Sequence, residues 1–298
     1  MLEDILKKCR LCPRDCAVDR TNGEVGYCKA DDKIKIGRIA LHFWEEPCIS
    51  GENGSGTVFF SHCNLGCVFC QNYKISKNCQ GRYITVEELS CAFLDLQHQG
   101  ANNINLVTAT HYIPQIIEAI KIAKSNGLKI PILFNCGGYE SVEALKLLEG
   151  YIDIYLPDFK YFNDKYSVKY SNAPQYSVFA NLALEEMYRQ VGKCEFDERG
   201  IIKRGVIIRH MMLPGLLFDS KKIIDYLYQK YGDDIYISIM SQYTPMENVK
   251  KYPEIYRTVD KRYYDTLVNY AAEIGIKNAY IQDGESVGES FIPDFYND

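Results

Sequence analysis

Ser61-His-Cys63-Asn-Leu-Gly-Cys67-Val-Phe-Cys70 follows directly on the apolar run Thr57–Phe60. The stretch joins an expected buried strand to a loop with three cysteines in C-x3-C-x2-C spacing, and a tight loop can aim all three thiolates inward. Thiolate sulfur is a ligand for zinc and for iron. We therefore expect a metal centre at the end of a strand.

Similar apolar runs recur along the chain, separated by amphipathic stretches. We expect seven strands: Thr57–Phe60, Ile104–Val107, Ile130–Phe134, Ile152–Leu156, Val206–Met212, Ile235–Met240 and Ala279–Ile281. Strand and helix in alternation indicate a parallel sheet, and the runs are typical of strands buried on both faces. The predicted fold class is α/β, a partial or full β/α barrel, favoured over an open doubly wound sheet.

Helix boundaries are also legible between these runs. Thr85-Val-Glu-Glu88 is a capping box that opens a helix running to Gln97. Glycines stand at or near five expected helix ends, at Gly127, Gly150, Gly192, Gly232 and Gly275. Residues 1–56 lack this rhythm, so we expect an N-terminal cysteine-rich cap there and the barrel over residues 57–298.

Composition and charge narrow the function classes. The 298 residues are 47% hydrophobic and 24% charged, as in a folded globular protein. A net charge of −5 gives no basic footprint, so no nucleic-acid partner is expected. The start does not resemble a signal peptide, and no apolar run nears the roughly 18 residues of a membrane span. We expect a cytoplasmic protein without a membrane contact, where close clusters among its twelve cysteines bind metal.

The central cysteine motif leaves two metals open. Three cysteines can hold a four-iron, four-sulfur (4Fe-4S) cluster and keep one iron open for another ligand. A structural zinc site closes with four ligands, and His62 or Cys79 could supply the last one. Because zinc sites usually present paired C-x2-C knuckles, the spacing favours iron and sulfur.

With an aromatic residue before its last cysteine, the motif resembles the signature of the radical S-adenosylmethionine (SAM) superfamily. The chain looks like the uncharacterised relatives of pyruvate formate-lyase activating enzyme over nearly its whole length. The matching stretches are His42-Phe-Trp-Glu-Glu-Pro47, Gly54–Phe60, Cys70-Gln-Asn72, Leu156-Pro-Asp-Phe-Lys160, Arg209-His210 and Pro293-Asp-Phe295. The resemblance implies that SAM bound to the cluster is cleaved to methionine and a 5′-deoxyadenosyl radical, which abstracts a substrate hydrogen.

The resemblance also implies roles for individual residues. It makes Cys63, Cys67 and Cys70 the ligands of the 4Fe-4S cluster and places Phe69 against the adenine of SAM, although Phe69 is equally compatible with a plain core position.

Three charged residues late in or just after expected strands complete the implied SAM site. Asp158 and Lys160 resemble the Asp-x-Lys of the activating enzymes, which reaches the SAM ribose and carboxylate. An ammonium complements a carboxylate, and an Asp accepts from hydroxyls. Arg209 matches their SAM-contacting arginine, and a charge within an apolar strand needs a partner that a bound ligand supplies.

One motif of the family is missing. Many members carry Gly-Gly-Glu after the second strand to bind the SAM amino group, whereas this chain has Val107-Thr-Ala-Thr-His111. We expect Thr108 or Thr110 to replace that acceptor, and His111 either to do so or to face the substrate. Gly137-Gly138 follows the third strand and is expected to permit a tight turn beside Asn135, a further candidate SAM contact.

A second cysteine cluster precedes the first. Cys9, Cys12, Cys16 and Cys28, with a glycine-containing return before the last, suffice for a complete thiolate site. Four thiolates suit either zinc or a second iron-sulfur cluster, and the spacing leaves both open.

The leading functional hypothesis is a radical SAM enzyme that abstracts hydrogen from a protein or peptide, with activation of a glycyl radical enzyme as the specific form. A reducing partner such as flavodoxin or ferredoxin is expected with it. The alternatives are a radical SAM enzyme acting on a small molecule and a non-catalytic structural zinc-binding module. The sequence leaves open the substrate, the hydrogen abstracted, the electron donor, the metal of the N-terminal cysteines and the oligomeric state.

Overall fold

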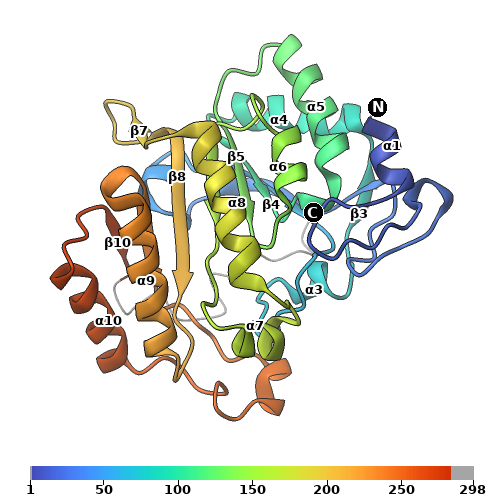
Figure 1. Cartoon of the computed structure of the whole chain (residues 1–298). Helices are drawn as coiled ribbons and strands as arrows, with labels where there is room; N and C mark the ends of the chain where they lie inside the picture. Colours follow the sequence, from blue (N-terminus) through green and yellow to red (C-terminus); the bar gives the residue numbers. More distant parts are fainter. Residues whose placement is uncertain (1, 283–298) are drawn as a thin grey trace.

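A single sheet runs through the computed structural model, which describes residues 2–282 (Figure 1). Its strands follow the order β10-β9-β8-β6-β5-β4-β2-β1-β3, and β7 pairs with β8 off this path. The strands are β1 (Ile34–His42), β2 (Ser55–Phe60), β3 (Arg82–Ile84), β4 (Ile104–Val107), β5 (Ile132–Cys136), β6 (Ile154–Pro157), β7 (Glu195–Phe196), β8 (Ile202–Met211), β9 (Tyr236–Met240) and β10 (Ala279–Ile281).

The seven predicted strands are all present, as β2, β4, β5, β6, β8, β9 and β10, with boundaries shifted by a few residues. Neighbours among these seven run parallel, which confirms the α/β class and the parallel sheet. Within residues 2–282 the end strands β3 and β10 do not pair with each other, so the sheet is open there and a full barrel is not formed.

Three antiparallel strands were not predicted. β1 pairs with β2, with Ile39 opposite Val58, and β3 pairs with the other side of β1. Their residues are only partly buried, so these strands lack the continuous apolar run of a strand covered on both faces. Since β1 falls inside residues 1–56, the part of the predicted cap from Ile34 onward extends the main sheet. The boundary at residue 56 stays a prediction.

Helices connect the parallel strands. They are α1 (Leu2–Lys7), α2 (Pro47–Ser50), α3 (Tyr73–Ser76), α4 (Val86–His98), α5 (Ile113–Ser125), α6 (Val142–Leu147), α7 (Asp164–Ser171), α8 (Tyr176–Val191), α9 (Leu217–Tyr231) and α10 (Lys261–Glu273), with short 3-10 turns at Arg20–Asn22, Thr110–Tyr112, Gly232–Asp234 and Glu247–Lys251. None of those helices is both long and apolar enough to cross a membrane. One stretch of the family resemblance, Pro293–Phe295, lies outside the described residues.

The predicted helix signals are confirmed. Thr85 caps α4, its hydroxyl accepts from the Glu88 amide, and the Glu88 carboxylate accepts from the Thr85 amide. The five predicted glycines all stand at helix ends with positive φ, between 52° and 98°. A left-handed residue ends a helix most cheaply when it is glycine, because glycine has no Cβ to clash.

The two faces of the sheet are covered differently, because successive strand residues point to opposite sides. Phe134 of β5 packs into the main core, which the long helices cover, with α8 lying across β6 and β8 (Figure 1). Its neighbour Leu133 faces the inner side and joins a smaller apolar cluster with Ile207 of β8. At the carboxyl ends of the strands, this inner face is polar, and the candidate site lies there.

Replacing Thr85 by alanine removes the α4 cap while leaving the buried face of the helix intact. We expect the free energy of unfolding to fall by about 1 kcal/mol, measured by urea denaturation. Thr266→Ala is the control, because this exposed hydroxyl on α10 bonds only within its own helix, and we expect a change of at most about 0.5 kcal/mol. Equal losses in both variants would contradict the importance of the cap.

Candidate active site

A large cavity opens on the inner face of the sheet, at the carboxyl ends of the parallel strands. Its volume is about 2060 Å³, counting the solvent at its mouth. The cavity gathers nine residues that the sequence singles out: Cys63, Cys67, Phe69, Cys70, Thr108, Asn135, Asp158, Lys160 and Arg209. These residues are far apart in the sequence. They meet in one place because they lie at or just after the carboxyl ends of β2, β4, β5, β6 and β8.

The three cysteines lie on the loop after β2, and hydrogen-bond donors face their sulfurs. The Leu65 amide donates to Cys63 Sγ at 3.4 Å, and the Ser171 hydroxyl donates to Cys67 Sγ at 2.9 Å. Cys70 Sγ lies 3.3 Å from the Ser76 hydroxyl. Donors to sulfur hold thiolate ligands in place and tune a bound cluster.

The proposed fourth zinc ligands do not join these cysteines. His62 Nδ1 lies 3.1 Å from the Cys28 carbonyl, and Cys79 Sγ lies 3.4 Å from the Lys77 carbonyl. Neither residue lines the cavity. In the part of the chain that the structure describes, no three His, Cys, Asp or Glu side chains converge as ligands of a single ion. The three cysteines border a shared space, which is the arrangement that a multi-iron cluster requires.

The charged residues of the site form one network. Lys160 Nζ lies 2.6 Å from Asp158 Oδ2, and Arg209 Nε lies 3.3 Å from Asp158 Oδ1. Burial raises the pKa of Asp158, but the Lys160 and Arg209 charges outweigh it and hold the pKa below its ordinary value. The strands explain the convergence, because Ile154, Leu156, Asp158 and Lys160 alternate along β6 and its extension.

A fourth member of the network, Glu45, was missed by the sequence analysis as a site residue. Its Oε2 accepts from Arg209 Nη1 at 3.0 Å, and its Oε1 accepts from Asn105 Nδ2 at 2.9 Å. Asn135 Oδ1 completes the shell by accepting from Arg209 Nη2 at 2.6 Å. The usable signals were Asn105, a polar residue within an expected buried strand, and the paired glutamates after β1.

The neighbouring Glu46 is a buried acid of the site with a carboxylate oxygen that lacks a hydrogen-bond partner. It is 8% exposed, its Oε2 has no hydrogen-bond partner, and it lines the same cavity. Burial raises the pKa of Glu46, and the Glu45 charge adds to the rise while Arg209 opposes it. Glu46 is therefore a buried acid with unused hydrogen-bonding capacity facing the cavity.

Thr108, Thr110 and His111 stand where many family members have Gly-Gly-Glu, and they line two different cavities. Thr108 lines the large cavity and adopts a left-handed backbone with φ of 59°. Thr110 and His111 are buried elsewhere, beside the N-terminal cysteines, where His111 Nε2 lies 2.7 Å from the Ser61 carbonyl. Of the two predicted threonine contacts, only Thr108 reaches the candidate site.

Two other expectations have clear outcomes. Gly138 has φ of 77°, and a Cβ there would collide with the Asp158 carbonyl, so the predicted tight turn beside Asn135 is confirmed. Phe69 is 5% exposed, lines the cavity and packs edge-on against Tyr243 at 5.9 Å between ring centroids. It is thus both a core residue and part of the cavity wall.

The fold and the cavity together define an α/β protein with a cysteine-lined, charged site at the carboxyl edge of its sheet. Residues 57–227 match the sequence profile of the radical SAM superfamily, and the chain belongs to that family. A relative, the uncharacterized protein MJ0674 of Methanocaldococcus jannaschii, is 29% identical over 294 residues, covering 93% of this chain and 78% of that protein.

Solved structures resemble the chain at low sequence identity. Streptococcus suis SuiB bound to S-adenosylmethionine matches with a TM-score of 0.50 and 12% identity over 75% of this chain and 49% of SuiB. The FeFe-hydrogenase maturase HydG from Carboxydothermus hydrogenoformans matches with a TM-score of 0.46 and 16% identity over 76% of this chain and 58% of HydG. The chain thus spans about half the length of SuiB, and the likeness concerns the fold.

His210, next to Arg209, makes the stability of the folded protein depend on pH. The ring is 2% exposed, Nδ1 lies 2.8 Å from the Phe159 carbonyl, and Nε2 has no partner. Burial lowers the pKa of His210 to about 4. Because the unfolded chain takes up a proton near its ordinary pKa of about 6.5, the folded state loses stability as the pH falls from there towards 4.

The His210→Asn variant tests this linkage, because an asparagine amide can still donate to the Phe159 carbonyl. Between pH 7 and pH 5 we expect the wild type to lose about 2 kcal/mol of unfolding free energy relative to the variant. Urea denaturation of both proteins at each pH measures the difference. A constant difference across that range would contradict a neutral, buried His210.

Proposed function

We propose that this chain cleaves SAM reductively and uses the resulting radical to abstract hydrogen from a protein or peptide, with activation of a glycyl radical enzyme as its specific form. The observation that carries the proposal is the meeting of the three-cysteine loop with the network around Arg209 in one cavity. We also propose that the sheet closes far enough around this cavity to act as a partial barrel.

The residues fit the cofactors that the family implies. Cys63, Cys67 and Cys70 would hold a 4Fe-4S cluster, because they border one space and donors face their sulfurs. Among residues 2–282, Cys136 is the one further cysteine that lines this cavity. When bound, such a cluster supplies the electron that cleaves SAM to methionine and a 5′-deoxyadenosyl radical.

The charged network fits the polar parts of SAM. Lys160 carries the cation that complements a carboxylate, and Asp158 carries the acceptors that ribose hydroxyls require. Both side chains keep about a fifth of their surface exposed in the cavity, 19% for Lys160 and 23% for Asp158, so a ligand can reach them. Arg209 pairs with Asp158 and is itself held by Glu45.

The mouth of the cavity supports a large substrate. Phe43 and Trp44 line it and are 50% and 65% exposed, which is unusual for large aromatic side chains. Exposed aromatic rings beside a charged site favour contact with another chain, since aromatic residues are enriched in protein interfaces. A flavodoxin or ferredoxin would supply electrons, and close cysteine clusters of the kind that bind metal support a cytoplasmic location.

Two alternatives remain distinguishable from this proposal. A radical SAM enzyme acting on a small molecule would form 5′-deoxyadenosine faster when a metabolite is added, without any partner protein. In a structural zinc module, the buried charges of Asp158, Lys160 and Arg209 would have no function. Burying charges costs free energy, so their presence needs an explanation. The network therefore favours an enzyme.

The first test is SAM cleavage after anaerobic reconstitution with iron and sulfide. We expect the wild type to form 5′-deoxyadenosine when dithionite is added and Cys67→Ala to fall to background, because a cluster ligand is lost. Cys91→Ala is the matched control, since Cys91 is exposed on α4 outside the cavity. Zinc without iron, and no cleavage by the wild type, would overturn the proposal.

The second test concerns SAM binding. Removing the Lys160 charge in Lys160→Met should weaken SAM binding about 10- to 100-fold, the cost of a charged hydrogen bond of about 1.5–3 kcal/mol. The measurement is KM for SAM or equilibrium binding to the reconstituted protein. Lys165→Met, an exposed lysine on α7, is the control. Unchanged affinity in Lys160→Met would place the SAM carboxylate elsewhere.

A further inference from the structure

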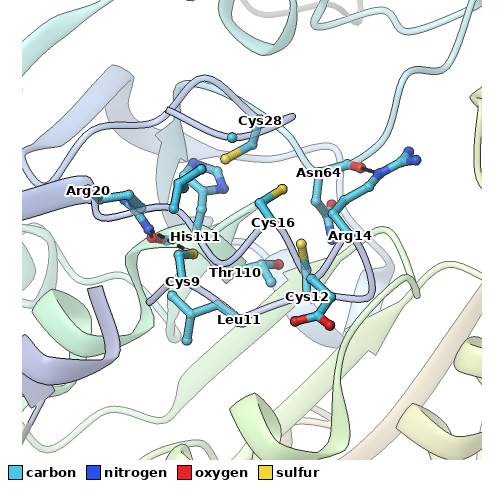
Figure 2. A pocket seen from close by; sticks show the side chains of 13 residues that line it. Cys9, Leu11, Cys12, Arg14, Cys16, Arg20, Cys28, Asn64, Thr110 and His111 are labelled. Atoms are coloured by element: carbon cyan, nitrogen blue, oxygen red, sulfur yellow. Dashed lines mark hydrogen bonds between the residues drawn. The ribbon is translucent and has the colours of Figure 1, made fainter. Parts of the chain in front are cut away.

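A second cavity, here called the N-terminal cavity, lies between the first 28 residues and the active-site loop. Its volume is about 390 Å³, counting the solvent at its mouth. Figure 2 shows the sulfurs of Cys9, Cys12, Cys16 and Cys28 around this space, with Asn64, Thr110 and His111 behind them. All four cysteines of the first cluster thus meet at one place, as their spacing predicted.

The backbone of this segment is folded to present the sulfurs. The Cys9 amide donates to the Val18 carbonyl at 3.0 Å, and the Ala17 amide donates back to the Cys9 carbonyl at 2.9 Å, which closes the loop between them. The Tyr27 amide donates to Cys16 Sγ at 3.4 Å. A Cβ on Gly26 would lie 2.7 Å from Cys16 Sγ, so only glycine lets the return pass this close.

A buried arginine faces the cavity without a carboxylate. Arg20 is 1% exposed, and its Nη1 lies 3.8 Å from Cys9 Sγ and donates to the His111 carbonyl at 2.6 Å. Its other donors bind the Asp31 carbonyl. Within residues 2–282 all its partners are therefore uncharged or sulfur. A buried cation requires a compensating negative charge, and an anionic metal-thiolate centre in the cavity provides one.

Arg14 packs at the edge of the cavity. Its Nε donates to the Asn64 carbonyl at 2.9 Å, and its guanidinium lies 3.6 Å from the centre of the Tyr27 ring. Its Nη2 is buried without a hydrogen-bond partner although the residue lines the cavity. The Arg20 guanidinium therefore lies close to a cysteine sulfur, whereas Figure 2 shows the Arg14 guanidinium directed away from the cysteines.

We propose that the N-terminal cavity holds a second iron-sulfur cluster, with Cys9, Cys12, Cys16 and Cys28 as its ligands. A single zinc ion requires four sulfurs at about 2.3 Å from one point, and within the described residues no such convergence of ligands is found. A cluster places irons and inorganic sulfides between its cysteines, whose sulfurs here border one cavity. The amide directed at Cys16 Sγ and the Arg20 guanidinium stabilise the negative charge of such a cluster.

The second cluster braces the loop that carries the active-site cysteines. Asn64 lines the N-terminal cavity and directly follows Cys63 in the chain. Its side-chain amide also donates to the Tyr139 carbonyl at 2.5 Å, while its carbonyl accepts from Arg14. The Cys28 carbonyl adds a contact to His62 at 3.1 Å on the other side of Cys63. Both neighbours of Cys63 are thereby fixed to the N-terminal segment.

The test uses the full chain with Cys63, Cys67 and Cys70 all changed to serine. After anaerobic reconstitution we expect about four irons and about four sulfides per chain to remain, against about eight of each in the wild type. Iron, zinc and sulfide analyses with Mössbauer spectra provide the count. One zinc without sulfide, or a chain free of metal, would overturn the proposal.

A reciprocal variant covers the case in which the triple variant does not fold. Cys12→Ser/Cys16→Ser should lose about half of the wild-type iron, whereas Cys91→Ser should lose none. Equal iron in the double variant and the wild type would count against a cluster at these cysteines. Because these readouts are metal contents, they stand apart from SAM cleavage, and failure of the proposed activity would leave them unaffected.

Arg20 supplies a readout that a purely structural residue would not change. In the triple-serine background, Arg20→Gln removes a positive charge beside the cluster, so its midpoint potential should shift to more negative values in an EPR-monitored redox titration. Arg199→Gln, an exposed arginine that pairs with Asp197, is the control. An unchanged potential in an Arg20→Gln protein that retains its iron would contradict the charge compensation described above.

Discussion

The ion pairs of Arg209 are the constraint on which the candidate site depends. The guanidinium projects from near the carboxyl end of β8 onto the inner face of the sheet, and the Arg209 side chain is only 16% exposed. Leaving such a charge unpaired would cost several kcal/mol, so acids must come to it. Glu45 reaches it from the segment after β1, and Asp158 reaches it from the end of β6. One residue thereby fixes the relative positions of strands that are distant in sequence.

The inner face of the sheet changes from apolar to charged along the strands. Leu133 and Ile207 join a small apolar cluster on this face. Arg209 follows Ile207 by two residues on β8, so strand alternation directs it to the same side, where it lines the cavity. The apolar cluster and the charged network thus share one face of the sheet.

Much of the fold was predictable from the sequence because buried parallel strands leave a direct signature. The apolar runs located all seven parallel strands, and polar residues at their ends, such as Asp158 and Arg209, located the site. Two local signals were also sufficient to predict structure: the capping box at Thr85 predicted a helix start, and Gly137-Gly138 predicted a turn. The capping box depends on hydrogen bonds within a few residues of sequence, whereas the turn at Gly138 also depends on the close approach of the Asp158 carbonyl.

What the sequence did not reveal depends on contacts between distant segments. The β1 strand has no continuous apolar run, so its pairing with β2, and the approach of Glu45 to Arg209, follow only from the assembled sheet. Likewise nothing local to Thr110 and His111 shows that they turn away from the large cavity toward the N-terminal cysteines. The sequence showed each of the two cysteine clusters, but it did not show that Asn64, next to Cys63, lines the cavity of the N-terminal cysteines.

The most direct test of this account is anomalous diffraction at the iron edge from anaerobic crystals grown with SAM. The account predicts iron enclosed by Cys63, Cys67 and Cys70, with SAM beside it and in contact with Lys160 and Asp158. Iron absent from these three cysteines, or SAM bound away from the charged network, would contradict it.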